Sequence, residues 1–232
     1  MQVRMLDHIA LYMNDRDEAA RFLTTHLGFH VVDHTERYTL VGAGGKLGKL
    51  TLFDAPEGTT PSPGEIGRIA IRVSDPEAAA SNLPPEVHAE RFDGGYAFTG
   101  PEGLPLALVP GEGEFADFDL EGFTLLSGSP EKSALAFAEM GFAPAGATTV
   151  TAGGYLMRLA DTAPDTETPN GGMLFHIGCL VDSAEDHRRE AEERGLEVTD
   201  FVEGPNTLAA FVRGPEGVSV EYVEHKPTFS LI

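Results

Sequence analysis

Cysteine, basic side chains and long apolar runs are all scarce in this chain of 232 residues. The one cysteine, Cys179, cannot form an intramolecular disulfide bond, which fits a reducing compartment. It lies in the apolar run FHIGCLV, so we expect a small buried side chain. No stretch reaches the ~18 apolar residues of a membrane span, and MQVRMLDHI has no signal-peptide core. We therefore predict a cytoplasmic protein.

The shortage of positive charge limits the partners of the protein. The chain has 16 Lys and Arg residues against 37 Asp and Glu residues, which gives a formal net charge of −21. Nucleic acids and anionic membranes would be repelled by such a surface, so neither is an expected partner. The apolar content of 41% is that of a globular protein, and the length allows a sizeable core in one or two domains.

The sequence repeats one pattern four times. Each repeat has a short apolar strand, a polar break, an amphipathic helix, and then turns with further strands. The first strands are LDHIALYM at 6–13, IGRIAIRV at 66–73, LEGFTLLS at 120–127 and LFHIGCLV at 174–181. Helices are expected within 15–29, 75–83, 129–142 and 183–195, each preceded by a capping Asp or Ser. Gly28, Gly141 and Gly195 stand where three of these helices should end.

A coarser duplication relates the two halves of the chain. GPEGLPLALV begins at residue 100 and GPEGVSVEYV at residue 214, an offset of 114. This predicts two halves, residues 1–112 and 113–232, with two repeats in each. One βαβββ repeat cannot bury its sheet alone, so two must pair to form a half-barrel around a cleft. The predicted fold class is α+β, with four βαβββ modules that form two half-barrel clefts.

The repeats resemble the vicinal-oxygen-chelate superfamily, which includes glyoxalase I, fosfomycin- and bleomycin-resistance proteins and extradiol ring-cleaving dioxygenases. The resemblance covers about residues 5–227 and rests on the four strand–helix openings and on the closing sequence RGPEGVSVEYVEH. In that superfamily, metal ligands occupy the third position of a module's first strand and a fixed position on its last strand. In modules 1 to 4, the first-strand position holds His8, Arg68, Gly122 and His176. The last-strand position holds Thr51, Ala107, approximately Arg158, and Glu221.

Three of these eight residues bind metals well, namely His8, His176 and Glu221. Pairing consecutive modules would separate His8 from the other two, whereas pairing module 1 with 4 and module 2 with 3 brings all three into one cleft. We therefore predict the crossed pairing. Two imidazoles and a carboxylate form the facial triad of non-haem Fe(II) enzymes, and the same set also accepts Mn(II), Zn(II) or Ni(II). A descendant that kept these residues but lost the ion is the alternative.

The modules that carry the predicted ligands favour one branch of the superfamily. In hydroquinone-cleaving dioxygenases the ligands come from modules 1 and 4, whereas catechol-type enzymes use modules 3 and 4, where Gly122 offers no ligand. Glyoxalase I has a second glutamate where Thr51 stands here. The resemblance thus implies a dioxygenase that cleaves a small aromatic diol with O2, most readily with Fe(II). A glyoxalase- or thiol-transferase-type enzyme and a bleomycin-resistance-like binding protein are the alternatives.

Three further residues are candidates for a catalytic role. Tyr12 shares a strand face with His8, and Tyr222 adjoins Glu221. Arg213 stands on the strand where the hydroquinone branch has an arginine, but the tyrosine of that branch is matched by Phe211. A homo-oligomer is compatible with this arrangement.

Other notable residues are expected to be structural. The glycine-rich segment GAGGKLGK at 42–49 misses the phosphate-binding pattern and predicts a hairpin turn. Arg68 and Arg158 are expected to pair with neighbouring carboxylates, and an anion pocket in the second cleft is the alternative. Surface or turn positions are expected for six histidines: His26, His30, His34, His88, His187 and His225.

Overall fold

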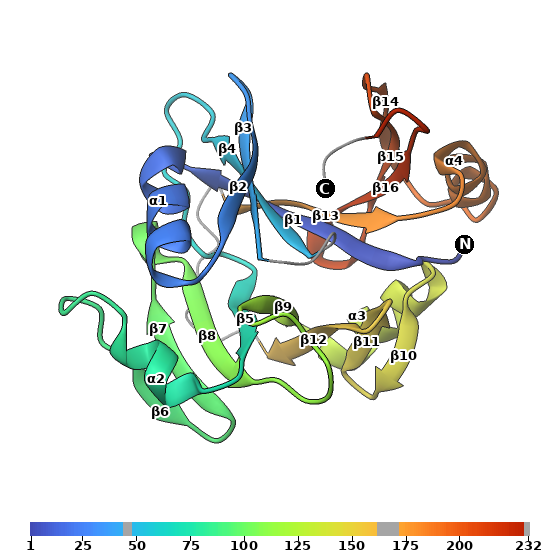
Figure 1. Cartoon of the computed structure of the whole chain (residues 1–232). Helices are drawn as coiled ribbons and strands as arrows, with labels where there is room; N and C mark the ends of the chain where they lie inside the picture. The colour runs from blue at the N-terminus through green and yellow to red at the C-terminus, as the bar shows by residue number, and fades with distance from the viewer. Residues whose placement is uncertain (44–47, 162–171, 230–232) are drawn as a thin grey trace.

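A computed structural model describes residues 1–43, 48–161 and 172–229, and it contains the four expected modules (Figure 1). Module 1 consists of β1 (Met5–Met13), α1 (Arg16–His26), β2 (His30–His34), β3 (Tyr38–Gly42) and β4 (Lys49–Asp54). Module 2 consists of β5 (Ile66–Val73), α2 (Pro76–Ser81), β6 (Glu90–Phe92), β7 (Gly95–Thr99) and β8 (Pro105–Pro110). Module 3 consists of β9 (Asp119–Ser127), α3 (Pro130–Glu139), β10 (Ala143–Gly146), β11 (Thr149–Ala152) and β12 (Tyr155–Asp161). Module 4 consists of β13 (Leu174–Leu180), α4 (Ala184–Glu193), β14 (Val198–Glu203), β15 (Thr207–Arg213) and β16 (Ser219–His225).

The strands form two eight-stranded sheets, and each sheet joins two modules that are not consecutive. The first sheet has the order β14-β15-β16-β13-β1-β4-β3-β2, and the second β10-β11-β12-β9-β5-β8-β7-β6. The joins are the antiparallel pairs β1 with β13 and β5 with β9. Modules 1 and 4 therefore share one half-barrel, and modules 2 and 3 share the other. The predicted fold class and the crossed pairing are confirmed.

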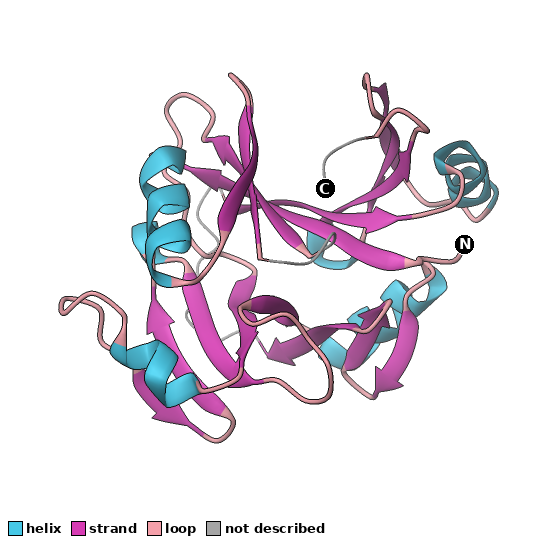
Figure 2. Cartoon of the chain, in the orientation of Figure 1, coloured by secondary structure: helices cyan, strands magenta, loops and turns pink. Residues whose placement is uncertain are grey.

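The helices begin and end largely where the capping residues predicted. The carboxylates of Asp15 and Asp75 accept backbone N–H groups in the first turns of α1 and α2, and the Ser183 hydroxyl does so for α4. Ser129 makes no such side-chain hydrogen bond before α3. The glycines after α1, α3 and α4 all have positive φ, which L side chains rarely adopt: Gly28 at 63°, Gly141 at 102° and Gly195 at 74°. As Figure 2 shows, α1, α2 and α4 lie at the periphery of the sheets.

Two short 3₁₀ turns have the same sequence, PEG, and each connects the two modules of one half of the chain. Pro101–Gly103 and Pro215–Gly217 each carry a glutamate in the left-handed region, with φ of 55° and 57°. Glu102 accepts the backbone N–H of Asn14 at 2.7 Å, just before α1. Glu216 accepts the hydroxyls of Ser127 and Ser133, at 2.6 and 3.1 Å, around the start of α3. These contacts link module 2 to module 1 and module 4 to module 3, across the two sheets.

One hydrophobic cluster fills the space around both sheets. It includes Ile9 and Leu50 from the first sheet and Ile69 and Phe123 from the second, all at most 3% exposed. Cys179 belongs to the same cluster and is fully buried, as its apolar context predicted. The segment predicted as a turn at 42–49 lies partly outside the described residues, and the strands β3 and β4 on its two sides pair antiparallel. Among the described residues, no helix is long and apolar enough to cross a membrane.

Candidate metal centre

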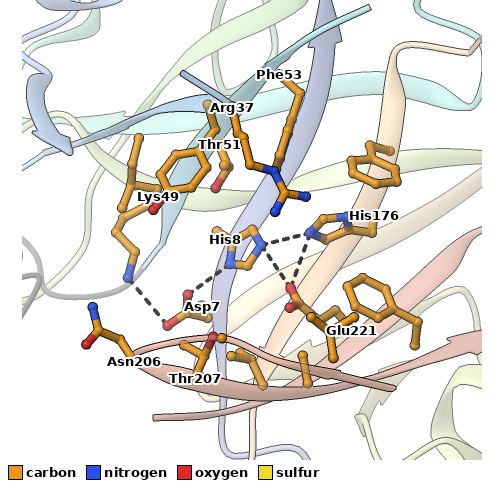
Figure 3. A pocket seen from close by; sticks show the side chains of 18 of the residues that line it. Asp7, His8, Arg37, Lys49, Thr51, Phe53, His176, Asn206, Thr207 and Glu221 are labelled. Atoms are coloured by element: carbon orange, nitrogen blue, oxygen red, sulfur yellow. Dashed lines mark hydrogen bonds and ion pairs between the residues drawn. The ribbon is translucent and has the colours of Figure 1, made fainter. Parts of the chain in front are cut away.

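Three adjacent strands of the first sheet bring His8, His176 and Glu221 together. Gly178 on β13 lies opposite both His8 on β1 and Glu221 on β16. His176 precedes Gly178 by two residues on β13, so its side chain points to the same face of the sheet. All three side chains line a cleft on this face, and they point toward one another (Figure 3). The first and last quarters of the chain thus meet at this point.

The three candidate ligand atoms form a small, nearly equilateral triangle. The Nε2 atoms of His8 and His176 are 3.0 Å apart, and Oε2 of Glu221 lies 3.1 Å from the first and 3.2 Å from the second. Metal–ligand bonds of about 2.1 Å at right angles would separate neighbouring ligand atoms by about 3.0 Å, and a tetrahedral arrangement would separate them by about 3.4 Å. The triangle therefore has the size that a divalent cation bound on one face by two imidazoles and a carboxylate requires.

The hydrogen bonds of the centre leave Nε2 of His8 and Oε2 of Glu221 directed at the same point. The Nδ1–H of His8 donates to Asp7 at 2.9 Å, which leaves the Nε2 lone pair of the neutral ring directed at the triangle. The buried Oε2 of Glu221 makes no well-aligned hydrogen bond with any described residue. Such a group is costly to bury unless a proton or a cation compensates it. The residues present therefore fit a metal ion.

The electrostatics of the centre favour a proton on His8. Burial opposes a charge on His8, but the neighbouring carboxylates of Asp7 and Glu221 raise its pKa to about 9. Burial acts against ionisation of Glu221 as well, yet its pairing with His176 and His8 lowers the pKa to about 2. Burial lowers the pKa of His176, which keeps this ring neutral. A metal must therefore displace a proton from His8 when it binds.

Asp7 supports the centre from a position that sequence alternation does not predict. A β-bulge interrupts the register between Leu6 and His8, so that two consecutive side chains, Asp7 and His8, reach the same cleft. The Asp7 carboxylate is 4% exposed and also lies 3.4 Å from Nζ of Lys49 and 2.9 Å from Nε2 of His225. Its pKa is lowered, because these partners outweigh the effect of burial. A carboxylate that orients a metal-binding imidazole in this way is a common partner of metal sites.

Gly178 provides the space that the His8 ring occupies. A Cβ atom at this position would lie 2.3 Å from Cε1 of His8 and 2.8 Å from its Nε2. The ring therefore lies directly over the backbone of β13, the middle one of the three strands that carry the candidate ligands. Any side chain at residue 178 would move the imidazole away from His176 and Glu221.

The cleft around the centre is large and rich in aromatic side chains. It has a volume of about 560 Å³. The Phe175 ring stands edge-on to His176 with centroids 4.5 Å apart, and the rings of Phe211 and Phe53 lie 5.3 and 6.1 Å from His176. At the other end, Phe229 stacks on His225 at 3.6 Å. Such a cavity suits a flat apolar molecule with a few polar groups.

The structure does not bring all three predicted catalytic residues to the centre. Tyr12 stacks on Phe175 at 4.5 Å, one aromatic ring removed from His176, and it is not among the residues that line the cleft. Tyr222 points to the opposite face of the sheet, where its buried hydroxyl donates to the backbone carbonyl of Met140 at 2.8 Å. Arg213 is exposed and pairs with Glu197 at 2.8 Å. The geometry therefore provides no catalytic role for Tyr222 or Arg213.

Two of the six histidines expected at surface or turn positions are placed differently by the structure. His225 lines the cleft beside Asp7 and forms part of its polar end. His187 is 8% exposed, and its ring accepts the backbone N–H of Gln2 at 3.2 Å. The charged residues next to both histidines in the sequence indicated solvent exposure. A helix or a strand end can nevertheless bury one face while its other residues are exposed. Arg158 pairs with Glu121 at 2.7 Å, as expected, whereas Arg68 lies over the ring of Phe92 at 4.4 Å.

Comparisons with known proteins agree with this architecture. The sequence model described as the Glyoxalase/Bleomycin resistance protein/Dioxygenase superfamily matches residues 5–106. A Bacillus subtilis protein provisionally described as a dioxygenase has a similar structure, with a TM-score of 0.75 and 21% identity over 97% of this chain and 86% of that one. Glyoxalase I from Zea mays gives a TM-score of 0.72 and 17% identity over 95% of this chain and 92% of that one. The cppA protein of Streptococcus pneumoniae gives a TM-score of 0.63 and 18% identity over 96% of this chain and 98% of that one.

No curated protein sequence matches the chain significantly. At these identities the structural likeness establishes the fold, and the sequence match to the superfamily is limited to residues 5–106. The matched segment contains module 1 and module 2 up to the start of β8, and modules 3 and 4 repeat the same βαβββ architecture. Residues 5–106 therefore match the glyoxalase/bleomycin resistance protein/dioxygenase superfamily, and the chain as a whole shares its fold with the solved structures to which it is similar.

Proposed function

We propose that the protein is a metal-dependent dioxygenase that cleaves the ring of a small aromatic diol, with His8, His176 and Glu221 as its metal ligands. The triangle of 3.0, 3.1 and 3.2 Å between the three ligand atoms carries this proposal. Fe(II) is the metal that this ligand set favours for oxygen chemistry, and Mn(II), Zn(II) and Ni(II) are the other candidates. His8, His176 and Glu221 would hold the cation, and a cation with three protein ligands would keep positions available for a substrate and O2.

The residues of the chain would position the substrate and protect the centre. A bound divalent cation supplies a site where a phenolic oxygen loses its proton at neutral pH. The rings of Phe53, Phe175 and Phe211 form an apolar wall that can hold an aromatic ring beside the centre and exclude water. Asp7 holds the His8 ring in the tautomer that directs Nε2 inward. Phe211 contributes only an apolar edge, so this position supplies no proton to the reaction.

Metal content and oxygen uptake test the proposal directly. We expect near-stoichiometric iron or manganese by elemental analysis after dialysis, or after anaerobic loading with Fe(II). The loaded protein should then consume O2 with at least one member of a panel of hydroquinones and catechols. Glu221→Gln removes the only anionic ligand while preserving its size, and should lower metal affinity about tenfold to a hundredfold. Unchanged metal affinity in this variant would refute the ligand assignment, and no O2 uptake across the panel would refute the dioxygenase activity.

A small-molecule-binding protein is the second candidate, and one observation favours it. The aromatic cleft of about 560 Å³ can stack a flat ligand without any reaction, and Phe211 lacks the hydroxyl that would assist one. A glyoxalase- or thiol-transferase-type enzyme is less well supported, because Thr51 lines the cleft where a second glutamate would be needed. Metal content separates these candidates. A protein that binds an aromatic ligand with wild-type affinity after complete metal removal is a binder.

A further inference from the structure

Arg37 places a positive charge in the cleft opposite the candidate metal centre. Its side chain lines the cleft, and its guanidinium group points toward His8 and His176 (Figure 3). Among the described residues it makes no side-chain hydrogen bond and no ion pair. The other cation of the cleft, Lys49, is buried and lies near Asp7. Arg37 is therefore the cleft cation whose hydrogen-bond donors remain available to a ligand.

The turn that carries Arg37 is held by its own hydrogen bonds. The hydroxyl of Thr35 accepts the backbone N–H groups of Arg37 and Tyr38, each at 3.1 Å. From α1, the guanidinium of Arg16 donates to the backbone carbonyls of Thr35 and Glu36, at 3.1 and 3.2 Å. The connection between β2 and β3 is thus fixed at several points. A preorganised loop loses little conformational entropy when its side chain binds a ligand.

The carboxylates on the neighbouring strands are engaged with other groups. Asp33 accepts the hydroxyl of Tyr38 at 2.9 Å, and Asp54 lies 3.3 Å from Nε of Arg16. In a chain with 37 acidic and 16 basic residues, a carboxylate partner for Arg37 would be easy to provide. The structure instead directs this guanidinium into the cavity.

A divalent cation at the centre would make the position of Arg37 unfavourable without a ligand. Two positive groups would then face the same cleft and repel each other, and because Arg37 is exposed, solvent screens part of this repulsion. An anionic group on the ligand removes this repulsion, and a carboxylate can form two parallel hydrogen bonds with a guanidinium. We propose that Arg37 binds a carboxylate on the ligand, so that the substrate is a hydroxylated aromatic acid. This inference rests on the proposed function for the hydroxylated ring, while the carboxylate is inferred from Arg37.

Two probes that differ only in the carboxylate test this inference. Under anaerobic conditions, calorimetry on the Mn(II)-loaded protein should show at least tenfold tighter binding of 2,5-dihydroxybenzoate than of hydroquinone. Arg37→Met retains most of the apolar stem but removes the charge, and should abolish this preference through a loss of about tenfold to a hundredfold for the acid alone. Arg37→Lys should recover part of it, because it keeps the charge without the paired donors. Arg21→Met, on the exposed face of α1, removes the same charge outside the cleft and should change neither affinity.

The outcomes distinguish this inference from the proposed function. Equal wild-type affinity for the two probes, a preference that persists in Arg37→Met, or no measurable binding of the acid would each overturn the carboxylate site. If the preference depends on Arg37 but no diol supports O2 uptake, the anion site stands and the dioxygenase proposal fails. If O2 is consumed without any preference for the acid, only the inference on Arg37 fails.

Discussion

Replacing Gly178 by alanine should separate His8 from the other two candidate ligands. The new Cβ atom would lie 2.3 Å from Cε1 of His8, whereas ordinary contacts begin at 3.4 Å. Gly178 lies within β13 and does not have a positive φ, so the backbone itself tolerates alanine. The imidazole must therefore move by about 1 Å, well beyond the tolerance of roughly 0.2 Å for metal–ligand bonds.

The expected loss follows from the loss of one ligand. Displacing a residue that merely supports a metal ligand costs about 10- to 100-fold in metal affinity, so displacing the ligand itself should cost at least about 100-fold. At a metal concentration that stabilises the wild type, a hundredfold weaker affinity removes about 2.7 kcal/mol of metal-dependent stabilisation. For a protein of this size, that corresponds to a melting temperature about 5–10 °C lower in the presence of metal.

Metal titration by calorimetry and thermal melting with and without metal would measure both effects. The metal-free variant should melt within a few degrees of the metal-free wild type, because the His8 ring can rotate into the open cleft. Gly128→Ala is the matched control, since a Cβ atom there meets nothing within 4 Å and the backbone is not in the positive-φ region. If Gly178→Ala binds metal as tightly as the wild type, His8 is not a ligand and the reasoning fails.

Three further variants or conditions have defined outcomes. In the metal-free protein the pKa of His8 rises on folding from 6.5 to about 9, so its contribution to the free energy of unfolding is complete below pH 6.5. That contribution, roughly 3 kcal/mol, should be lost as the pH rises through 9. Urea unfolding at several pH values measures this loss. If His8→Gln showed the same dependence of the unfolding free energy on pH as the wild type, the assignment to His8 would be wrong. Tyr222→Phe should leave metal affinity and O2 uptake unchanged while costing about 1–3 kcal/mol of stability in urea unfolding, because the buried carbonyl of Met140 loses its donor. Asp7→Asn should weaken metal binding about 10- to 100-fold in a calorimetric titration, and an unchanged affinity would mean that His8 needs no orienting carboxylate.

The module order and the crossed pairing could be predicted from the sequence because they leave local and repeated signals. The first strands recur with a histidine at the third position of modules 1 and 4 only. The glycines after α1, α3 and α4 mark helix ends because a positive φ restricts the choice of residue. Alternation along β16 placed Ser219, Glu221 and Val223 on one face, and all three line the cleft. The boundary predicted between residues 112 and 113 falls in the connection from β8 to β9 and remains a prediction.

The residues that surround the centre could not be found in this way. Asp7 reaches the cleft only because a bulge breaks the alternation of β1, and no residue pattern marks that bulge. Arg37 and His225 come from a turn and from the end of a strand, so their directions depend on tertiary contacts such as Arg16 with Thr35. Tyr222 was considered for its proximity to Glu221, but adjacent residues on a regular strand point to opposite faces.

The pairing of β13 with β1 and with β16 also sets the time at which a metal can first be held. During synthesis Glu221 on β16 follows His8 after roughly 10–40 s, at ordinary elongation rates of about 5–20 residues per second. Until then a nascent chain presents an isolated imidazole rather than a chelating centre. Metal acquisition by this protein is therefore tied to the synthesis and folding of module 4.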